Sequence, residues 1–558
     1  MPSAQEPGGR ILAFVARAAA TSRGLLPRPA MRLATLNLVV AVALVSAANL
    51  PFWKTVLSTH PQTGFVAGVA SLVVILVNLL LTGLTWGRMA KPALFLVLLT
   101  SAVATYFMHR FGIVFDRDMI ANVFQTDLHE ALELLNPAFV VWMLAFGVLP
   151  CFAVQRVRIV RGSWKSRLAE TAAVVLVSAL VVGTAAATVY QPLASLARNH
   201  RELRFQLVPL NIAGALGKYV VRSLDTPHGI EVVGADARRA VPAALSARRR
   251  VTIVVVGETA RAANFSLLGY ARDTNPRLAR SDVIALSNVH SCGTATAASV
   301  PCMFQDVGRD GYRASMAKSR ENLLDVLQRA GIAVLWRDNN SGCKHVCDRV
   351  PQEDLAHLEL PELCPAGHCY DEVLLHGLQQ RIDQLSGDGV IVLHMLGSHG
   401  PTYYKRYPPT QAAFKPACDS GEFEHCSRDA IVNAYDNTIR YTDRVLSAVI
   451  DLLARNAQSL DSAFLYVSDH GESLGEHGLY LHGLPYAIAP DEQTHVPMVV
   501  WLSEGYRERI DMRCMRDLAN RPFSHDNVFH SVLGLMHVST TAYKEERDLF
   551  SPCRRVAG

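Results

Sequence analysis

Long runs of apolar residues fill much of the first third of this chain. Five of them approach the length of about 20 residues that a helix needs to cross the hydrocarbon core of a bilayer. Trp53, Trp86 and Trp164 stand near their ends, as is typical of membrane interfaces. A single run of this kind also fits a buried core helix, but five in succession predict a membrane domain with five transmembrane helices. The predicted spans are 33–53, 64–86, 92–108, 137–155 and 169–190.

Basic residues around these spans predict their orientation. Cytoplasmic segments of membrane proteins are rich in Lys and Arg, and such residues precede the first span and fill the loop between the fourth and fifth. Both places then face the cytoplasm, and an odd number of spans puts the rest of the chain on the opposite side. We expect a cytoplasmic tail at 1–31, a membrane domain at 32–190, a bridge along the membrane surface at 191–248 and an exported domain at 249–558.

After residue 250 the pattern changes to short apolar runs that alternate with helical periodicity. Such alternation is typical of an α/β domain, in which helices cover both faces of a largely parallel sheet. Strands are predicted at 251–256, 332–336, 390–396, 463–467 and 496–501, and helices at 321–330, 372–385 and 430–456.

The formal net charge of +5 over 558 residues does not indicate a nucleic-acid partner. Most of the early basic residues flank the membrane spans. The chain has no basic stripe interleaved with aromatic residues and no zinc-finger spacing. We therefore expect membrane lipids as partners and no nucleic acid.

Cysteine usage supports an exported domain. Of 11 cysteines, only Cys151 falls in a predicted span, and all the others follow Tyr190. An even set in close pairs indicates disulfides formed in an oxidising compartment. A cytosolic zinc cluster is the alternative, but the topology and the irregular spacing argue against it. Spacing leaves the connectivity open, and pairing of neighbours is favoured: 292–302, 343–347, 364–369, 418–426 and 514–553.

Two of the predicted strands end in residues that are able to bind a metal ion. The apolar run 464–467 leads to Asp469 and His470, and the run 251–256 leads to Glu258. Open α/β sheets bind ligands at the carboxyl ends of their strands, and zinc accepts both oxygen and nitrogen donors. In isolation, the Asp-His pair also fits a structural hydrogen bond and Glu258 a helix N-terminal charge.

A segment rich in small and hydroxyl residues, 291–302, lies between Cys292 and Cys302. Most hydroxyls in such a segment cap helices. A hydroxyl bound to zinc, however, loses its proton more easily, and a helix N-terminus stabilises an anionic phosphate. Thr294 or Thr296 is therefore a candidate nucleophile.

Four motifs occur in order along the chain: Gly257-Glu-Thr-Ala-Arg261, Ser291-Cys-Gly-Thr-Ala-Thr-Ala297, Trp336-Arg-Asp-Asn-Asn-Ser341 and Ser468-Asp-His-Gly-Glu-Ser-Leu-Gly-Glu476. Together they resemble the motifs of the membrane phosphoethanolamine transferases that modify lipid A, a family of the alkaline phosphatase and sulfatase superfamily. The resemblance covers the whole chain. It implies that 249–558 is a periplasmic catalytic domain, a sulfatase-like α/β sandwich, behind a multi-pass anchor in the inner membrane of a Gram-negative bacterium.

The resemblance also implies roles for individual residues. It implies zinc as the cofactor, held by Glu258, Thr296, Asp469 and His470, with Thr296 as the nucleophile. Residues matching positions that contact the phosphate, a second zinc or the lipid donor are His399, His482, Ser341, Lys344, Asn122, Thr126 and Glu130. Asn122, Thr126 and Glu130 follow one another at intervals of four residues, and this spacing independently puts them on one helix face. For the two histidines the alternative is a structural hydrogen bond, and for this face a solvated polar surface.

The implied reaction moves phosphoethanolamine between two lipids. Thr296 attacks the phosphorus of phosphatidylethanolamine, diacylglycerol leaves into the membrane, and a phospho-threonine intermediate passes phosphoethanolamine to a phosphate of lipid A. The added amine offsets negative charge there, which weakens binding of cationic peptides such as polymyxins. We expect the enzyme to be a monomer.

Other functions stay open at this point. The acceptor is alternatively a core sugar of lipopolysaccharide or another glycan. A sulfatase is disfavoured because the chain has no Cys-x-Pro-x-Arg segment. A membrane receptor or transporter is the non-enzymatic alternative, but ionisable residues, which normally mark transport paths, are scarce in the predicted spans.

Overall fold

The computed structural model describes residues 28–125, 131, 134–160, 162–200, 202–224, 229–240, 248–365 and 368–555. Internal contacts divide the chain into two compact units. The first unit comprises Met1–Thr105, Val141–His200 and Leu207–Leu210, and the second comprises Tyr106–Val140, Arg201–Gln206 and Asn211–Gly558. The boundaries expected at residues 31, 190 and 248 stay predictions.

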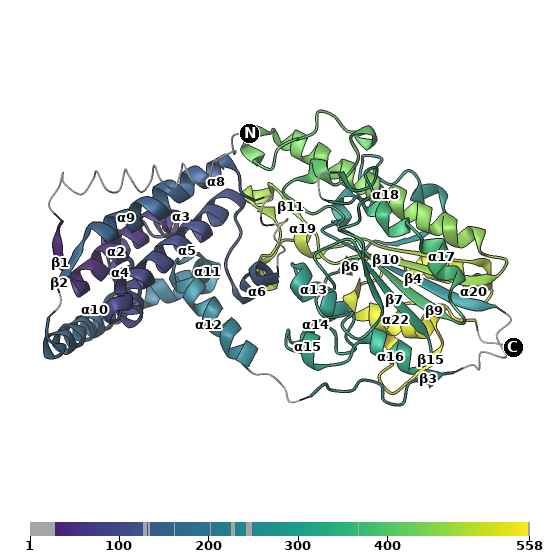
Figure 1. Cartoon of the computed structure of the whole chain (residues 1–558), viewed down its shortest axis with the longest axis horizontal. Coiled ribbons are helices and arrows are strands. Elements are labelled where there is room, and N and C mark those ends of the chain that lie inside the picture. The colour runs from purple at the N-terminus through teal and green to yellow at the C-terminus, as the bar shows by residue number, and fades with distance from the viewer. Residues whose placement is uncertain are drawn as a thin grey trace, which may run out of the picture. The chain divides into compact units, whose positions relative to one another are not determined.

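Helices dominate the described part of the first unit (Figure 1). Four helical segments of the described chain are long and apolar enough to cross a membrane, and a bent helix pair would make a fifth span. The four are α4 (Thr63–Leu84), α5 (Ala90–Phe111), the run Pro137–Arg156 that contains α8 (Pro137–Trp142) and α9 (Leu149–Arg156), and α10 (Trp164–Asn199). They agree with four of the predicted spans, although α10 continues nine residues beyond its predicted end at Tyr190.

The first predicted span, 33–53, is not one straight helix. It is divided into α2 (Leu33–Ala47) and α3 (Leu50–Thr59), which meet at an angle of 66°. The buried side chain of Asn49 occupies the break, where its amide donates to the carbonyls of Leu44 and Val208 at 3.0 Å each. Pro51 follows in the first turn of α3, where a missing N–H costs nothing.

The second unit contains a seven-stranded sheet, and the largely parallel arrangement agrees with the prediction. Its order is β5-β13-β10-β4-β9-β7-β8, and the four pairs from β10 to β8 are parallel. The strands are β4 (Arg249–Gly257), β5 (Ile284–Leu286), β7 (Ala333–Asp338), β8 (Gln352–Asp354), β9 (Gly389–His394), β10 (Leu460–Ser468) and β13 (Met498–Leu502). All five predicted strands are present. The short edge strands β5 and β8 were not predicted, and β13 is antiparallel to both of its neighbours.

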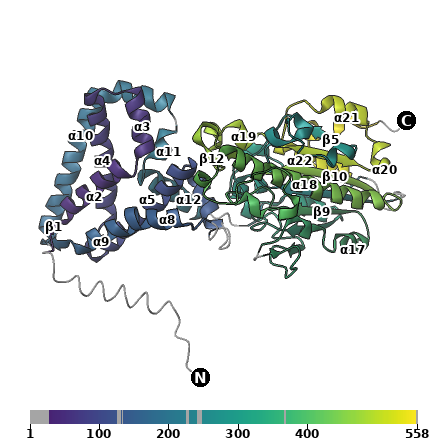
Figure 2. The same ribbon diagram turned by 90° about the horizontal axis from the view of Figure 1, so that it is seen from above.

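Helices cover both faces of this sheet (Figures 1 and 2). Helix α18 (Arg428–Arg455) lies on one face, and α16 (Leu323–Arg329) and α22 (Val528–Leu535) lie on the other. Every residue of β10 is buried, as expected for a strand covered on both sides. The single helix predicted at 372–385 is wrong: a 3-10 turn at Asp371–Leu375 and α17 (Leu378–Asp383) replace it, because Gly377 has a φ of +69°.

All five favoured disulfides form in the structure, which confirms the pairing of neighbours. They are Cys292–Cys302, Cys343–Cys347, Cys364–Cys369, Cys418–Cys426 and Cys514–Cys553. Four of them close loops of ten residues or fewer, so they brace local segments.

Candidate active site

Strand register brings the predicted metal ligands together. Ser468 at the end of β10 lies opposite Gly257 at the end of the parallel strand β4. Glu258 and Asp469 each come one residue later, at the same edge of the sheet. His470 follows Asp469 directly, so one edge carries two carboxylates and an imidazole.

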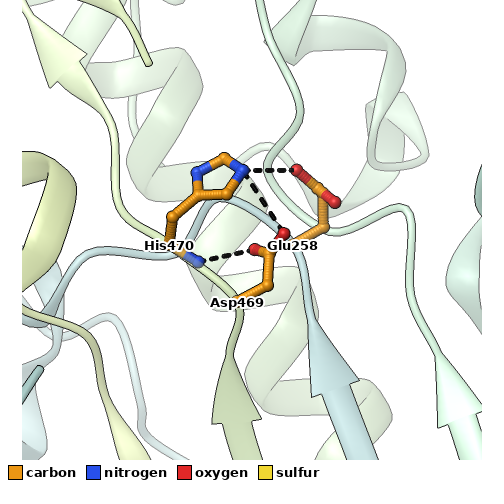
Figure 3. Close-up of side chains that lie close together, drawn as sticks. All are labelled: Glu258, Asp469 and His470. Carbon is orange, nitrogen blue, oxygen red and sulfur yellow. Dashed lines mark hydrogen bonds and ion pairs between the residues drawn. The ribbon is translucent and has the colours of Figure 1, made fainter. Parts of the chain in front are cut away.

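These three side chains point toward one another (Figure 3). His470 Nε2 lies 3.4 Å from Glu258 Oε1 and 3.3 Å from Asp469 Oδ2. One ligand atom from each residue lies within 4.8 Å of the others, and all three residues are buried. The three residues are therefore a candidate metal site.

Thr296 completes the cluster from another element. It is the first residue of α13 (Thr296–Met303), and its hydroxyl lies 3.1 Å from Glu258 Oε2 and 3.4 Å from His470 Nε2. The other candidate, Thr294, turns away and donates to the carbonyl of Leu484 at 2.5 Å. The structure therefore brings Thr296, and not Thr294, to the metal ligands.

The donor set fits zinc. Asp469 Oδ2 is buried and makes no hydrogen bond within the described chain. An orphan carboxylate oxygen of this kind is costly unless a cation is nearby. Two carboxylates, one imidazole and one hydroxyl supply four oxygen and nitrogen donors, the number and type that zinc binds.

Electrostatics of the two carboxylates support the same conclusion. Burial, followed by the negative charge of Glu258, raises the pKa of Asp469 to about 7. Burial also acts to raise the pKa of Glu258, but the nearby histidines, His470 first, outweigh it and hold that pKa below its usual value. The negative charges of these two buried carboxylates repel each other, and a divalent cation would stabilise both.

Neighbouring residues that sequence reasoning missed hold the ligands in place. Asn340 donates to Glu258 Oε2 at 2.9 Å and to the carbonyl of Met395 at 2.8 Å. Thr259 donates to Glu258 Oε1 at 2.5 Å. Asn340 lies inside the motif 336–341, which could have marked it as a candidate site residue. The motif alone, however, does not show which groups its side chain contacts.

The two predicted histidines lie beside the cluster. The ring of His482 is centred 4.3 Å from that of His470, and the ring of His399 is centred 5.6 Å from that of His482. His482 Nδ1 is held by Glu472 Oε2 at 2.8 Å. A buried tyrosine, Tyr403, donates to the other oxygen of Glu472 at 2.6 Å. Glu472 was not identified from the sequence.

The residues matched to the lipid donor divide into two groups. Lys344 Nζ donates to Ser341 Oγ at 2.8 Å, and Ser341 directly follows Asn340. Asn122 is half-buried on α6 (Arg117–Gln125), which packs against α13. Thr126 and Glu130 lie outside the described residues, so the predicted helix face stays a prediction.

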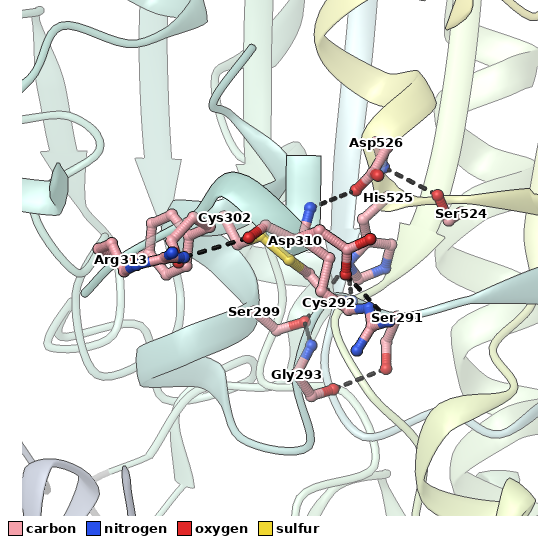
Figure 4. Close-up of a disulfide and its surroundings, with 12 residues drawn as sticks. Ser291, Cys292, Gly293, Ser299, Cys302, Asp310, Arg313, Ser524, His525 and Asp526 are labelled. Carbon is pink, nitrogen blue, oxygen red and sulfur yellow. Dashed lines mark hydrogen bonds and ion pairs between the residues drawn. A yellow bond between two sulfur atoms is a disulfide. The ribbon is translucent and has the colours of Figure 1, made fainter. Parts of the chain in front are cut away.

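A buried histidine, also missed, ties the nucleophile segment to the sheet (Figure 4). His525 Nδ1 accepts from the N–H of Cys292 at 3.1 Å, and its Nε2 lies 2.9 Å from the carbonyl of Ser468. Ser299 of α13 adds a further link by donating to the carbonyl of Asp469 at 2.5 Å. The disulfide Cys292–Cys302 closes the same segment. No local pattern marks His525, because its partners lie far away in the chain.

An open cavity of about 530 Å³ in the second unit lies next to Thr296. Ala295 and Ala297, the residues on either side of Thr296, line it. Further walls come from α6, the segment 312–318 and the loop 483–486. The cavity therefore opens beside the end of α13 that carries Thr296.

Comparisons with known proteins agree with this geometry. Residues 250–538 match the sulfatase family model, and residues 73–224 match the model described as phosphoethanolamine transferase EptA/EptB. The chain is 43% identical to the phosphoethanolamine transferase EptA of Escherichia coli (strain K12), over 96% of this chain and 99% of that protein. It is 38% identical to the phosphatidylethanolamine transferase Mcr-1 of Escherichia coli, over 83% and 88%.

A solved structure covers both units. The integral membrane lipooligosaccharide phosphoethanolamine transferase A (EptA) from Neisseria meningitidis has a TM-score of 0.90 and 37% identity to this chain. The match covers 95% of this chain and 100% of that one.

Proposed function

The chain belongs to the lipid A phosphoethanolamine transferase family, and from this premise we propose that it transfers phosphoethanolamine from phosphatidylethanolamine to a phosphate of lipid A. One observation carries the proposal. The hydroxyl of Thr296 lies 3.1 Å from Glu258 and 3.4 Å from His470, inside a buried group that is ready to bind a metal ion. An activated hydroxyl is the nucleophile that a covalent phosphoryl transfer requires.

Zinc is the cofactor that these residues would hold, through Glu258, Thr296, Asp469 and His470. When bound, it would lower the pKa of the Thr296 hydroxyl and offset negative charge that develops on the phosphoryl oxygens. Asn340 and Thr259 orient the Glu258 carboxylate through hydrogen bonds of 2.9 and 2.5 Å. Hydrogen bonds of this kind fix the orientation of a metal ligand.

The first half of the reaction forms a phospho-enzyme. Thr296 Oγ1 bonds to the phosphorus of phosphatidylethanolamine, and the bond from phosphorus to the glycerol oxygen breaks. Diacylglycerol leaves with a proton on that oxygen. His399 and His482 stand next to the cluster, where they are suited to contact the phosphate. Ser341, Lys344, Asn122, Thr126 and Glu130 are proposed to bind the donor headgroup.

The second half transfers phosphoethanolamine to the acceptor and restores Thr296. Because diacylglycerol and lipid A are both membrane lipids, a helical anchor in the inner membrane keeps a periplasmic catalytic domain close to them. We propose that the enzyme acts as a monomer. The amine added to lipid A reduces its negative charge, so we propose that activity confers resistance to polymyxins.

Mass spectrometry of lipid A tests the proposal. A Gram-negative host would express the wild-type chain or Thr296→Ala, with membrane expression checked for both. We expect a mass increase of one phosphoethanolamine with the wild type and none with the variant. No increase with either would remove lipid A as the acceptor and favour a core sugar, whereas an increase with both would refute Thr296 as the nucleophile.

A further inference from the structure

Positive charge gathers around the cavity beside Thr296. The charged residues that line it are Asp116, Arg117, Arg313, Lys318 and Lys344. Four cations thus face one carboxylate. Such a lining attracts an anionic ligand, and the low-dielectric walls of a cavity strengthen this attraction.

Two of these cations have no carboxylate partner in the described structure. Arg313 lies on the loop between α14 (Gly308–Gly311) and α15 (Met316–Ser319), where it donates only to the carbonyls of Asp310 and Tyr312, at 3.1 and 2.8 Å (Figure 4). Lys318 is exposed on α15 and, among the described residues, makes no ion pair.

Other arginines nearby are paired with carboxylates. Arg309, Arg320 and Arg349 each form an ion pair with an aspartate. Carboxylates are therefore common in this part of the domain, yet they leave Arg313 and Lys318 unpaired at the cavity. Both side chains are exposed, so they are available to a ligand that enters the cavity.

The two half-reactions differ in their need for positive charge. Phosphatidylethanolamine is a zwitterion whose ammonium offsets its own phosphate. The acceptor is a phosphomonoester with a charge between −1 and −2 near neutral pH, since its second pKa is about 6. The phosphoethanolamine group that Thr296 then carries keeps its own ammonium, so it is a zwitterion like the donor. The net negative charge of the acceptor therefore enters in the second half-reaction alone.

We propose that Arg313 and Lys318 bind the phosphomonoester of the acceptor glycolipid, and so act in the acceptor half-reaction and not in the donor half-reaction. This inference rests on the transferase function proposed above. An oxygen of the acceptor phosphate bonds to the phosphorus held by Thr296, and the bond from phosphorus to Thr296 Oγ1 breaks. A monoanionic acceptor supplies the proton that Oγ1 regains, and the product carries a P–O–P linkage to ethanolamine.

The two half-reactions are measured separately with the full-length protein in detergent. Phosphatidylethanolamine alone reports the release of diacylglycerol in the first turnover, and added lipid A reports transfer. The test variant is Arg313→Gln/Lys318→Gln. Arg313→Lys/Lys318→Arg keeps both charges, and Arg280→Gln removes an exposed cation that does not line the cavity.

For the neutral double variant we expect diacylglycerol release within about twofold of wild type and a rise of about tenfold in the KM for lipid A. Added salt should raise that KM in the wild type more than in the variant, because screening removes the same attraction. The charge-preserving variant and Arg280→Gln should resemble wild type.

Equal loss of release and transfer would overturn the inference, because the two residues would then serve the donor or the fold. An unchanged KM for lipid A would overturn it as well. Failure of the wild-type protein to release diacylglycerol at all would instead refute the proposed function, and this outcome is visible before any variant is compared.

Discussion

The links made by His525 allow a prediction with a matched set of variants. The buried ring accepts from the N–H of Cys292 through Nδ1, and its Nε2 meets the carbonyl of Ser468. Asn places an acceptor near the position of Nδ1, Gln places a donor near that of Nε2, and Leu supplies neither. A buried polar group that loses its partner costs about 1–3 kcal/mol. His525→Leu should therefore destabilise the domain by about 4 kcal/mol, and His525→Asn and His525→Gln by about half as much.

The pH dependence of stability gives this prediction a second readout. Burial is the main cause that lowers the pKa of His525 to about 4, from 6.5 for an exposed histidine. Between these pH values the unfolded chain binds more protons than the folded protein, so stability rises with pH. The contribution of His525 is complete above pH 6.5 and is lost as the pH falls toward 4. Its full size is about 3 kcal/mol, from about 1.4 kcal/mol for each pKa unit.

Thermal unfolding of the full-length protein in detergent, followed by intrinsic fluorescence at pH 7.5 and at pH 5, measures both effects. At about 2 °C for each kcal/mol, His525→Leu should melt about 8 °C below wild type at pH 7.5. The difference should shrink at pH 5, because the wild type has lost part of the histidine contribution. A melting temperature within 1 °C of wild type at pH 7.5, or a difference that grows at pH 5, would refute the reasoning.

Three further predictions concern the metal ligands and a disulfide. Asn340→Ala removes the 2.9 Å hydrogen bond to Glu258 and should weaken zinc binding by about 10–100-fold in a chelator competition, with the exposed Asn520→Ala as its control. Removal of metal by EDTA should abolish diacylglycerol release and lower the melting temperature, because Glu258 and Asp469 then lie buried together without a cation. Added zinc should restore both the release and the melting temperature, and failure to restore either would contradict a zinc site at these residues. Cys514→Ser/Cys553→Ser removes a disulfide between residues 39 positions apart and should lower the free energy of unfolding by about 4 kcal/mol. Cys292→Ser/Cys302→Ser removes one with a separation of 10 positions and should lower it by roughly 3 kcal/mol. The reverse order would contradict the argument that a longer loop gives more stabilisation.

Much of the fold follows from patterns between residues that are close in the chain. Apolar runs of about 20 residues predicted the long helices, and the short runs before Glu258 and Asp469 predicted two strands, which the structure places side by side. Parallel strands end at one edge of a sheet, so the two carboxylates had to lie near each other once the sheet formed. Closeness in the chain also favoured the correct disulfide pairs, since four of them close short loops.

Long-range contacts decided the rest. The residues alone left Thr294 and Thr296 open, and the family resemblance implied Thr296. The folded chain brings the hydroxyl of Thr296 to Glu258, which lies 38 positions away in the chain. The bend at Asn49 depends in the same way on Val208, 159 residues away. The antiparallel direction of β13 and the unpaired state of Arg313 likewise depend on which segments return to meet them.

The amino-acid sequence by itself determined the apolar helices and the α/β organisation, placed the candidate metal ligands at strand ends and favoured the pairing of neighbouring cysteines. Each of these features arises from periodicity or spacing over a few residues, which local sterics and hydrophobicity set. The tertiary structure decided which hydroxyl lies beside the candidate metal ligands, which side chains hold those ligands in place, and which cations at the cavity have no carboxylate partner among the described residues. Hydrogen bonds and ion pairs act over about 3–4 Å, so their partners are selected only when distant segments are packed together.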